Sequence, residues 1–157
     1  MAIHSLEKIQ TIPASLEKVW DFISSPKNLR EITPDYMGFE ITSNQLSDRM
    51  YAGQIITYKV RPLLGIPLNW CTEITHVKEH EYFVDEQRQG PYQLWHHQHH
   101  IREVKGGVEM TDIVHYQVPL GFIGELFVPL IVTPKLKDIF QYRFEKMEQL
   151  FGKIQMS

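Results

Sequence analysis

Residues 95–118 read WHHQHHIREVKGGVEMTDIVHYQV, two alternating runs joined by a pair of glycines. Side chains on a β-strand leave alternately by opposite faces, and a glycine pair between such runs favours a tight turn. The stretch therefore predicts a β-hairpin with its turn at Gly106-Gly107. This turn predicts four cross-strand pairs: Ile101 with Asp112, His99 with Val114, His97 with Tyr116, and Trp95 with Val118.

One face of this hairpin is predicted to look into the protein. The even positions of the second run are apolar (Val108, Met110, Val114, Tyr116 and Val118), with Asp112 as the exception. An apolar stripe on a strand faces a core, so His97 and His99 are predicted to face it too. Because polar groups are costly to bury without partners, we expect a hydrogen-bonded network at the wall of a cavity.

The composition is that of an ordinary globular protein. The chain has 157 residues, 43% hydrophobic and 22% charged, which fits a single domain over 1–157. A net charge of −3, with no basic run among aromatic residues, predicts no nucleic-acid binding. The single cysteine, Cys71, allows no internal disulfide, and no signal-type segment is evident. We therefore expect a cytoplasmic protein, either a monomer or a weak dimer.

Residues 118–132 form the most apolar stretch of the chain. They include two prolines, two glycines and Glu125, and they are too few to cross a bilayer. We expect no integral membrane segment here but a buried segment packed on the sheet. Peripheral contact with lipid is the alternative.

The predicted elements are one strand, two short helices, six strands and a long helix. The strands are predicted at 4–12, 39–43, 54–61, 68–77, 82–89, 92–104 and 108–118, with the short helices after Ser15 and at 27–32. The long helix is predicted from the spacing of Leu136, Phe140, Phe144, Met147 and Phe151. Pro134 either begins this helix or kinks a longer one that starts near Phe122.

This order predicts an α+β domain in which a curved antiparallel sheet of about seven strands wraps round the long helix. One helix cannot fill the concave face, so a cavity is expected between helix and sheet. The predicted ligand-binding residues are Tyr58, Trp70, Trp95, His97, His99, Asp112 and Tyr116. By contrast, Asp85, Glu86 and Arg88 are predicted to lie mostly at the surface.

Several motifs resemble the START-related ligand-binding superfamily (SRPBCC), and in particular its bacterial cyclase/dehydrase-like and coenzyme Q-binding-like members. They are Val19-Trp20-Asp21-Phe22-Ile23, Pro26-x-Asn28-Leu29, Gly90-Pro91-Tyr92-x-Leu94-Trp95-His96-His97-x-His99 and Met110-Thr111-Asp112-x-Val114-x-Tyr116-x-x-Pro119-Leu120-Gly121. The resemblance implies a helix-grip fold with a central hydrophobic pocket. It implies no particular reaction, because one fold can host many functions.

Two functions follow as hypotheses. The first is binding of a hydrophobic or aromatic small molecule, such as a lipid, polyketide or quinone-like compound. Access would require movement of residues 120–133 or 63–67. The second is a cyclase or dehydratase, a lyase or isomerase that uses His97, His99, Asp112 and Tyr116, with His97, His99 and Asp112 as the candidate catalytic residues. A dimeric module that uses the outer sheet face is a third possibility.

Metal binding is a further reading of the same histidines. His97 and His99 have the i, i+2 spacing of ligands on one strand face, and Asp112 offers an oxygen. No third and fourth inward ligands are evident, because Cys71 falls on the face opposite Trp70. We therefore predict no metal site and no other cofactor.

Overall fold

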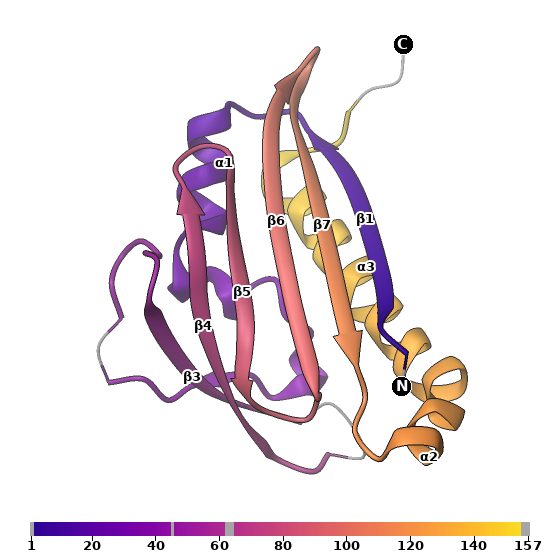
Figure 1. Cartoon of the computed structure of the whole chain (residues 1–157). Helices are drawn as coiled ribbons and strands as arrows, with labels where there is room; N and C mark the ends of the chain where they lie inside the picture. The colour runs from indigo at the N-terminus through magenta and orange to yellow at the C-terminus, as the bar shows by residue number, and fades with distance from the viewer. Residues whose placement is uncertain (1, 45, 62–64, 155–157) are drawn as a thin grey trace.

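The structure is a computed structural model that describes residues 2–44, 46–61 and 65–154 (Figure 1). Its seven strands form one antiparallel sheet in the order β1-β7-β6-β5-β4-β3-β2. They are β1 (His4–Ile12), β2 (Glu40–Ile41), β3 (Gln54–Val60), β4 (Leu68–Lys78), β5 (Tyr82–Gln89), β6 (Leu94–Val104) and β7 (Gly107–Gln117). The predicted helix-grip architecture is confirmed, with β2, β3 and β6 shorter than predicted.

Short helices follow β1, as predicted. Helix α1 (Leu16–Ile23) begins where the Ser15 hydroxyl accepts a hydrogen bond from the backbone N–H of Lys18. The second predicted helix is a 3₁₀ turn, η1 (Pro26–Arg30), and a further 3₁₀ turn, η2 (Asp35–Met37), was not predicted. These turns close one end of the space above the sheet.

The C-terminal helix is the longer of the two predicted versions. It runs through α2 (Gly121–Phe127), the π-helical turn η3 (Val128–Val132) and α3 (Thr133–Phe151). A proline inside a helix removes one N–H and crowds the carbonyl four residues earlier. The wide π turn contains Pro129 and directly precedes Pro134, so the chain stays helical past both. Figure 1 shows α3 lying along one face of the sheet, with α2 at its end.

The buried face of α3 matches the predicted face at Leu136, Phe140 and Met147, whereas Phe151 is only partly buried. The buried residues of the helix are Leu136, Phe140, Arg143 and Met147, while Phe144 is only partly buried. A charged residue thus occupies the middle of an otherwise apolar helix face. Beyond it, Met147 packs into an apolar cluster with Ile12 and Trp20.

The β6–β7 hairpin forms, but its predicted pairing is wrong by two residues. His99 lies opposite Asp112, His97 opposite Val114 and Trp95 opposite Tyr116, because the turn is Lys105-Gly106. Gly107 belongs to β7, where a Cβ would lie 2.0 Å from the carbonyl oxygen of Ile12. This close approach fixes the register. A register shift of two residues keeps every side chain on the same face of the sheet, so the same side chains point inward as predicted.

The prediction that 118–132 is buried is wrong for most of its side chains. Val118, Gly124 and Val128 are buried. Exposed large apolar side chains in this stretch are Leu120, Phe122, Ile123, Leu126, Phe127, Leu130 and Ile131. Among the described residues, no helix is both long and apolar enough to span a membrane.

Candidate functional site: a cavity between the sheet and α3

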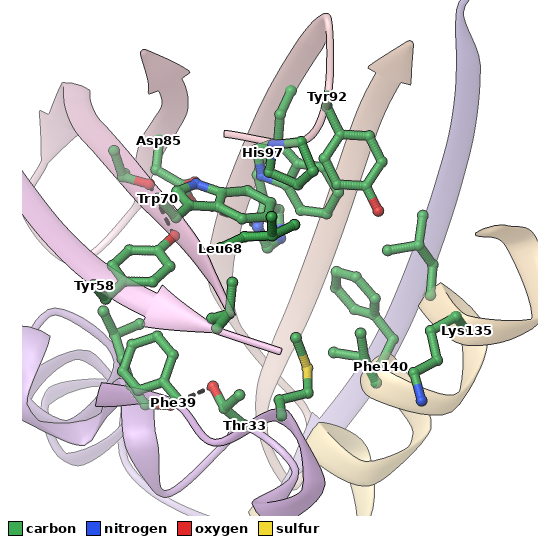
Figure 2. A pocket seen from close by; sticks show the side chains of 18 of the residues that line it. Thr33, Phe39, Tyr58, Leu68, Trp70, Asp85, Tyr92, His97, Lys135 and Phe140 are labelled. Atoms are coloured by element: carbon green, nitrogen blue, oxygen red, sulfur yellow. Dashed lines mark hydrogen bonds and ion pairs between the residues drawn. The ribbon is translucent and has the colours of Figure 1, made fainter. Parts of the chain in front are cut away.

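A cavity of about 510 Å³ lies between the inner face of the sheet and α3 (Figure 2). Strands β3 to β6 form one wall, and Leu136, Ile139 and Phe140 of α3 form the other. In Figure 2, Tyr58 and Trp70 face across this space towards Phe140 and Lys135. Leu120, Phe127 and Ile131 of the C-terminal helical run border its mouth.

Aromatic rings make up much of the sheet-side wall. Tyr58 stacks on Trp70 at a ring-centroid distance of 5.9 Å and an interplanar angle of 17°. Trp95 meets Trp70 at 5.4 Å and 90°, and Tyr92 packs against Trp95 at 4.9 Å. These rings provide flat apolar surfaces in two orientations. Burial raises the pKa of the Tyr58 and Tyr92 hydroxyls, so both stay neutral.

Five ionisable side chains meet at one part of the cavity wall, and we call them the polar cluster. They are Asp85 (β5), His97 and His99 (β6), Asp112 (β7) and Arg143 (α3). The imidazole centroids of His97 and His99 are 3.7 Å apart, and the His99 ring stacks on Phe83 at 4.1 Å. Asp112 bridges the two histidines from behind, with Oδ1 3.1 Å from Nε2 of His97 and 2.9 Å from Nδ1 of His99.

The contacts of the imidazole nitrogens indicate where protons are held. Nε2 of His99 lies 2.7 Å from Oδ2 of Asp85 and donates to this carboxylate. Nδ1 of His99 lies between two groups, 3.2 Å from Nη2 of Arg143 and 2.9 Å from Oδ1 of Asp112. His97 donates from Nε2 to Asp112, which leaves its Nδ1 as an acceptor 3.5 Å from Asp85.

The cluster favours ionised carboxylates and a neutral His97. Burial and the neighbouring His99 lower the pKa of His97 to about 4, against the opposing effect of the two carboxylates. Burial alone would raise the pKa of Asp112, but Arg143 and the two histidines hold it well below its usual value. The pKa of Asp85 is likewise lowered, because His97, His99 and Arg143 outweigh the effect of its burial.

Two buried donors at the cavity have no hydrogen-bond acceptor among the described residues. They are Nε1 of Trp70 and Nε of Arg143, and both side chains line the cavity. An unpaired buried donor costs about 1–3 kcal/mol. Two donors without a partner thus belong to side chains of the wall that also contains His97.

The structure places the predicted residues unequally around the cavity. Tyr58, Trp70, Trp95, His97 and His99 line it. Asp112 and Tyr116 do not: Asp112 lies behind the histidines, and the Tyr116 hydroxyl bonds to Thr133 at 3.1 Å within the adjoining core.

Sequence reasoning missed two members of the polar cluster. Asp85 was predicted at the surface but is mostly buried, because it lies opposite His97 in the β5–β6 ladder. Its alternation with Phe83 was the available signal. Arg143 was missed although it falls on the apolar face of α3, four residues before Met147. Tyr92 and Phe39, which also line the cavity, were not proposed as ligand contacts.

Asp85, His97 and His99 are also the residues that could approach a metal ion. Their ligand atoms lie within 4.8 Å of one another. Each is already engaged inside the cluster, and the Arg143 guanidinium supplies a positive charge beside them.

The sequence matches the family described as polyketide cyclase / dehydrase and lipid transport over residues 12–155. The chain belongs to this family. The match confirms the resemblance to the START-related superfamily. No curated protein matches the sequence.

Solved structures share the fold at low identity. TTHA0849 from Thermus thermophilus is 14% identical, with 93% of this chain and 95% of that chain covered and a TM-score of 0.69. CV1439 from Chromobacterium violaceum is 12% identical, with 96% and 99% covered and a TM-score of 0.70. Ara h 8.0201 is 15% identical, with 96% and 98% covered and a TM-score of 0.63. At such identities the likeness concerns the fold.

Proposed function

We propose that this protein binds an apolar, ring-bearing small molecule that carries a neutral hydroxyl or carbonyl group. The observation that carries the proposal is a cavity of about 510 Å³ with aromatic walls, two of whose lining side chains, Trp70 and Arg143, hold a buried donor without a partner. This volume falls within the ~300–1,000 Å³ of typical ligand pockets. Such pockets combine apolar walls with a few polar groups that fix orientation.

The aromatic wall favours a flat ligand. A ring placed beside the stacked pair Tyr58–Trp70 would also meet the edge of Trp95, which stands perpendicular to Trp70. Stacked and edge-on contacts are the two favoured geometries of aromatic pairs. Most of the affinity would come from apolar burial, at about 25 cal/mol per Å².

The polar cluster selects the functional group of the ligand. A hydroxyl can donate to Nδ1 of His97 and accept from Nε1 of Trp70 or Nε of Arg143. A carbonyl can accept from either donor. A ligand carboxylate fits poorly, because the ionised Asp85 already lies at this part of the wall.

The same residues were candidates for acid–base catalysis, and the pKa of His97 argues against that role. A general base works best with a pKa near the working pH. The pKa of His97 is about 4, and both carboxylates have pKa values below their usual range. These pKa shifts favour fixed hydrogen bonding by His97, Asp85 and Asp112 over proton exchange.

Matched naphthalene probes test the proposal by tryptophan-quenching titration. We expect 2-naphthol to bind about tenfold more tightly than 2-methylnaphthalene, because its hydroxyl makes one or two additional hydrogen bonds. Trp70→Phe keeps a ring but removes the unpartnered donor. It should therefore reduce the ratio of the 2-naphthol affinity to the 2-methylnaphthalene affinity several-fold. Trp95→Phe is the control, since it changes a ring of the same wall and should leave the preference intact.

Two results would overturn the proposal. One is failure of every naphthalene probe to bind the folded protein, and the other is equal binding of the hydroxylated and methylated probes. If neither result is obtained, native mass spectrometry of the protein isolated from its own source identifies which neutral ring compound is retained.

A further inference from the structure

The mouth of the cavity carries an unusual concentration of exposed apolar side chains. Residues 120–131, here called the mouth segment, hold seven of the fifteen exposed large hydrophobic residues described in the structure. Phe122, Leu120 and Leu130 are 79%, 76% and 75% exposed. Single exposed apolar residues are ordinary, but a contiguous patch marks an interaction surface.

The mouth segment presents no free charge to a partner. Its one ionisable residue is Glu125, whose carboxylate bonds to Nε2 of His4 on β1 at 2.7 Å. This pairing ties the carboxylate to the sheet. Specific protein interfaces usually have a polar rim that fixes the orientation of the partner. An apolar surface with no free charge suits a partner, such as a lipid bilayer, that does not have to be held in one orientation.

A lysine just after the mouth segment and the tyrosine that it contacts are typical of a membrane interface. Lys135 holds its ammonium 3.7 Å from the ring centroid of Tyr36, and the Tyr36 ring is itself exposed. Lysine and tyrosine are enriched where apolar side chains enter the acyl region, because their polar ends remain at the headgroups. The patch thus has an apolar centre bordered by an aromatic–cation pair.

Leu120 adds an independent argument. Its backbone lies in the left-handed region, with a φ of 69°, and as N-cap of α2 it makes no side-chain capping bond. A bulky residue at such a φ is uncommon, and Asn or Gly would suit both the conformation and the cap better. The backbone conformation and the helix cap therefore do not account for a leucine here, which points to a role of its exposed side chain at the cavity mouth.

We propose that the mouth segment inserts its apolar side chains into the interfacial region of a phospholipid bilayer. Leu120, Phe127 and Ile131 also line the cavity, so docking would turn the cavity mouth towards the acyl chains. A second copy of this chain on the same patch would seal that mouth. The docking does not depend on which molecule the cavity binds.

Flotation with phosphatidylcholine vesicles tests the proposal. The protein should float with the vesicles, and a change from about 0.1 to 0.5 M NaCl should not release it, because no charge pairing is involved. Phe122→Gln combined with Leu130→Gln should lower the partition coefficient at least about tenfold. Both residues lie outside the cavity lining, and glutamine preserves helix propensity.

A matched control has the same number of apolar residues removed elsewhere. Ile9→Thr combined with Ile55→Thr changes side chains on β1 and β3 that are 52% and 49% exposed, and it should leave vesicle binding unchanged. Circular dichroism and sedimentation velocity accompany each variant. The proposal is overturned if the folded protein stays free of neutral vesicles or if it binds only anionic vesicles in low salt. It is also overturned if the Gln substitutions instead dissociate a stable dimer.

Discussion

The polar cluster and the mouth segment border the same cavity but differ in every physical respect. In the cluster, ionisable side chains from three strands and α3 are buried and hydrogen-bonded to one another. In the mouth segment, large apolar side chains face solvent and the one carboxylate is turned to the sheet. The buried hydrogen bonds of the cluster stabilise the folded state, whereas the exposed side chains of the mouth segment add little to its stability. Substitutions in the two regions should therefore have unequal effects on stability.

The largest effect is expected from Asp112→Asn. This change removes a buried negative charge that neighbours His97, His99 and Arg143. Breaking a buried ionic network by removing one partner typically costs about 3–5 kcal/mol. Urea unfolding at pH 7 should show this loss. Glu109→Gln on the same strand is the control, because its ion pair with Arg102 is exposed and should cost less than about 1 kcal/mol. Similar losses for the two variants would contradict the contrast between cluster and surface.

The next effect is a pH dependence that originates at His97. Its pKa is about 4 in the folded protein and 6.5 ordinarily, so between these values the unfolded chain binds more protons. The free energy of unfolding should therefore fall as the pH falls through this window, by roughly 2–3 kcal/mol. The lowered pKa values of Asp85 and Asp112 add a further loss below pH 3.8.

Urea titrations between pH 7 and pH 4 measure this dependence. His97→Gln should be less stable than the parent at pH 7 and should show a flatter pH profile. His96→Gln alters the neighbouring histidine, which lies on the outer face and contacts Glu86 at 3.0 Å, so it should keep the parental slope. Equal slopes in the parent and His97→Gln would show that another group is responsible.

A smaller effect distinguishes the cavity from the packed core. Val60 is buried but lines the cavity, so Val60→Phe can extend into open space and should change stability by less than about 1 kcal/mol. Val108 is buried in the apolar cluster beyond Arg143, where Val108→Phe should cost about 1–3 kcal/mol from overpacking. Val60→Phe should also weaken 2-naphthol binding about tenfold. Equal destabilisation by the two substitutions would mean that the cavity is closed in solution.

The faces of the hairpin could be predicted from the sequence, whereas its register could not. Alternation alone assigns His97, His99 and Asp112 to one face, and a shift of two residues leaves that assignment unchanged. Gly106-Gly107 permits two turn placements. In the fold, Gly107 lies against Ile12 of β1, a residue 95 positions away along the chain, and local sequence does not reveal this contact.

Asp85 and Arg143 show where local patterns reach their limit. Asp85 stands beside Glu86 and near Arg88, so its surroundings in the sequence resemble a solvated face. Arg143 interrupts an apolar helix stripe that Phe144 can equally well continue. Each residue tolerates burial because Arg143 and the carboxylates of Asp85 and Asp112 compensate one another's charge, while the histidines hydrogen-bond to the carboxylates. Such compensation across β5, β6 and α3 is visible only in three dimensions.

The mouth segment shows the opposite limit, since its hydrophobicity predicted burial that does not occur. If its side chains contribute nothing to the fold, Leu120→Asn should raise the free energy of unfolding by about 0.5–1 kcal/mol, because Asn tolerates a φ of 69° and can cap α2. Phe122→Ser should change it by less than about 0.5 kcal/mol. Thermal and urea unfolding provide both values. A loss of more than about 1 kcal/mol in either variant would place the side chain in the folded core, and the unequal roles of the two ends of the cavity would no longer hold.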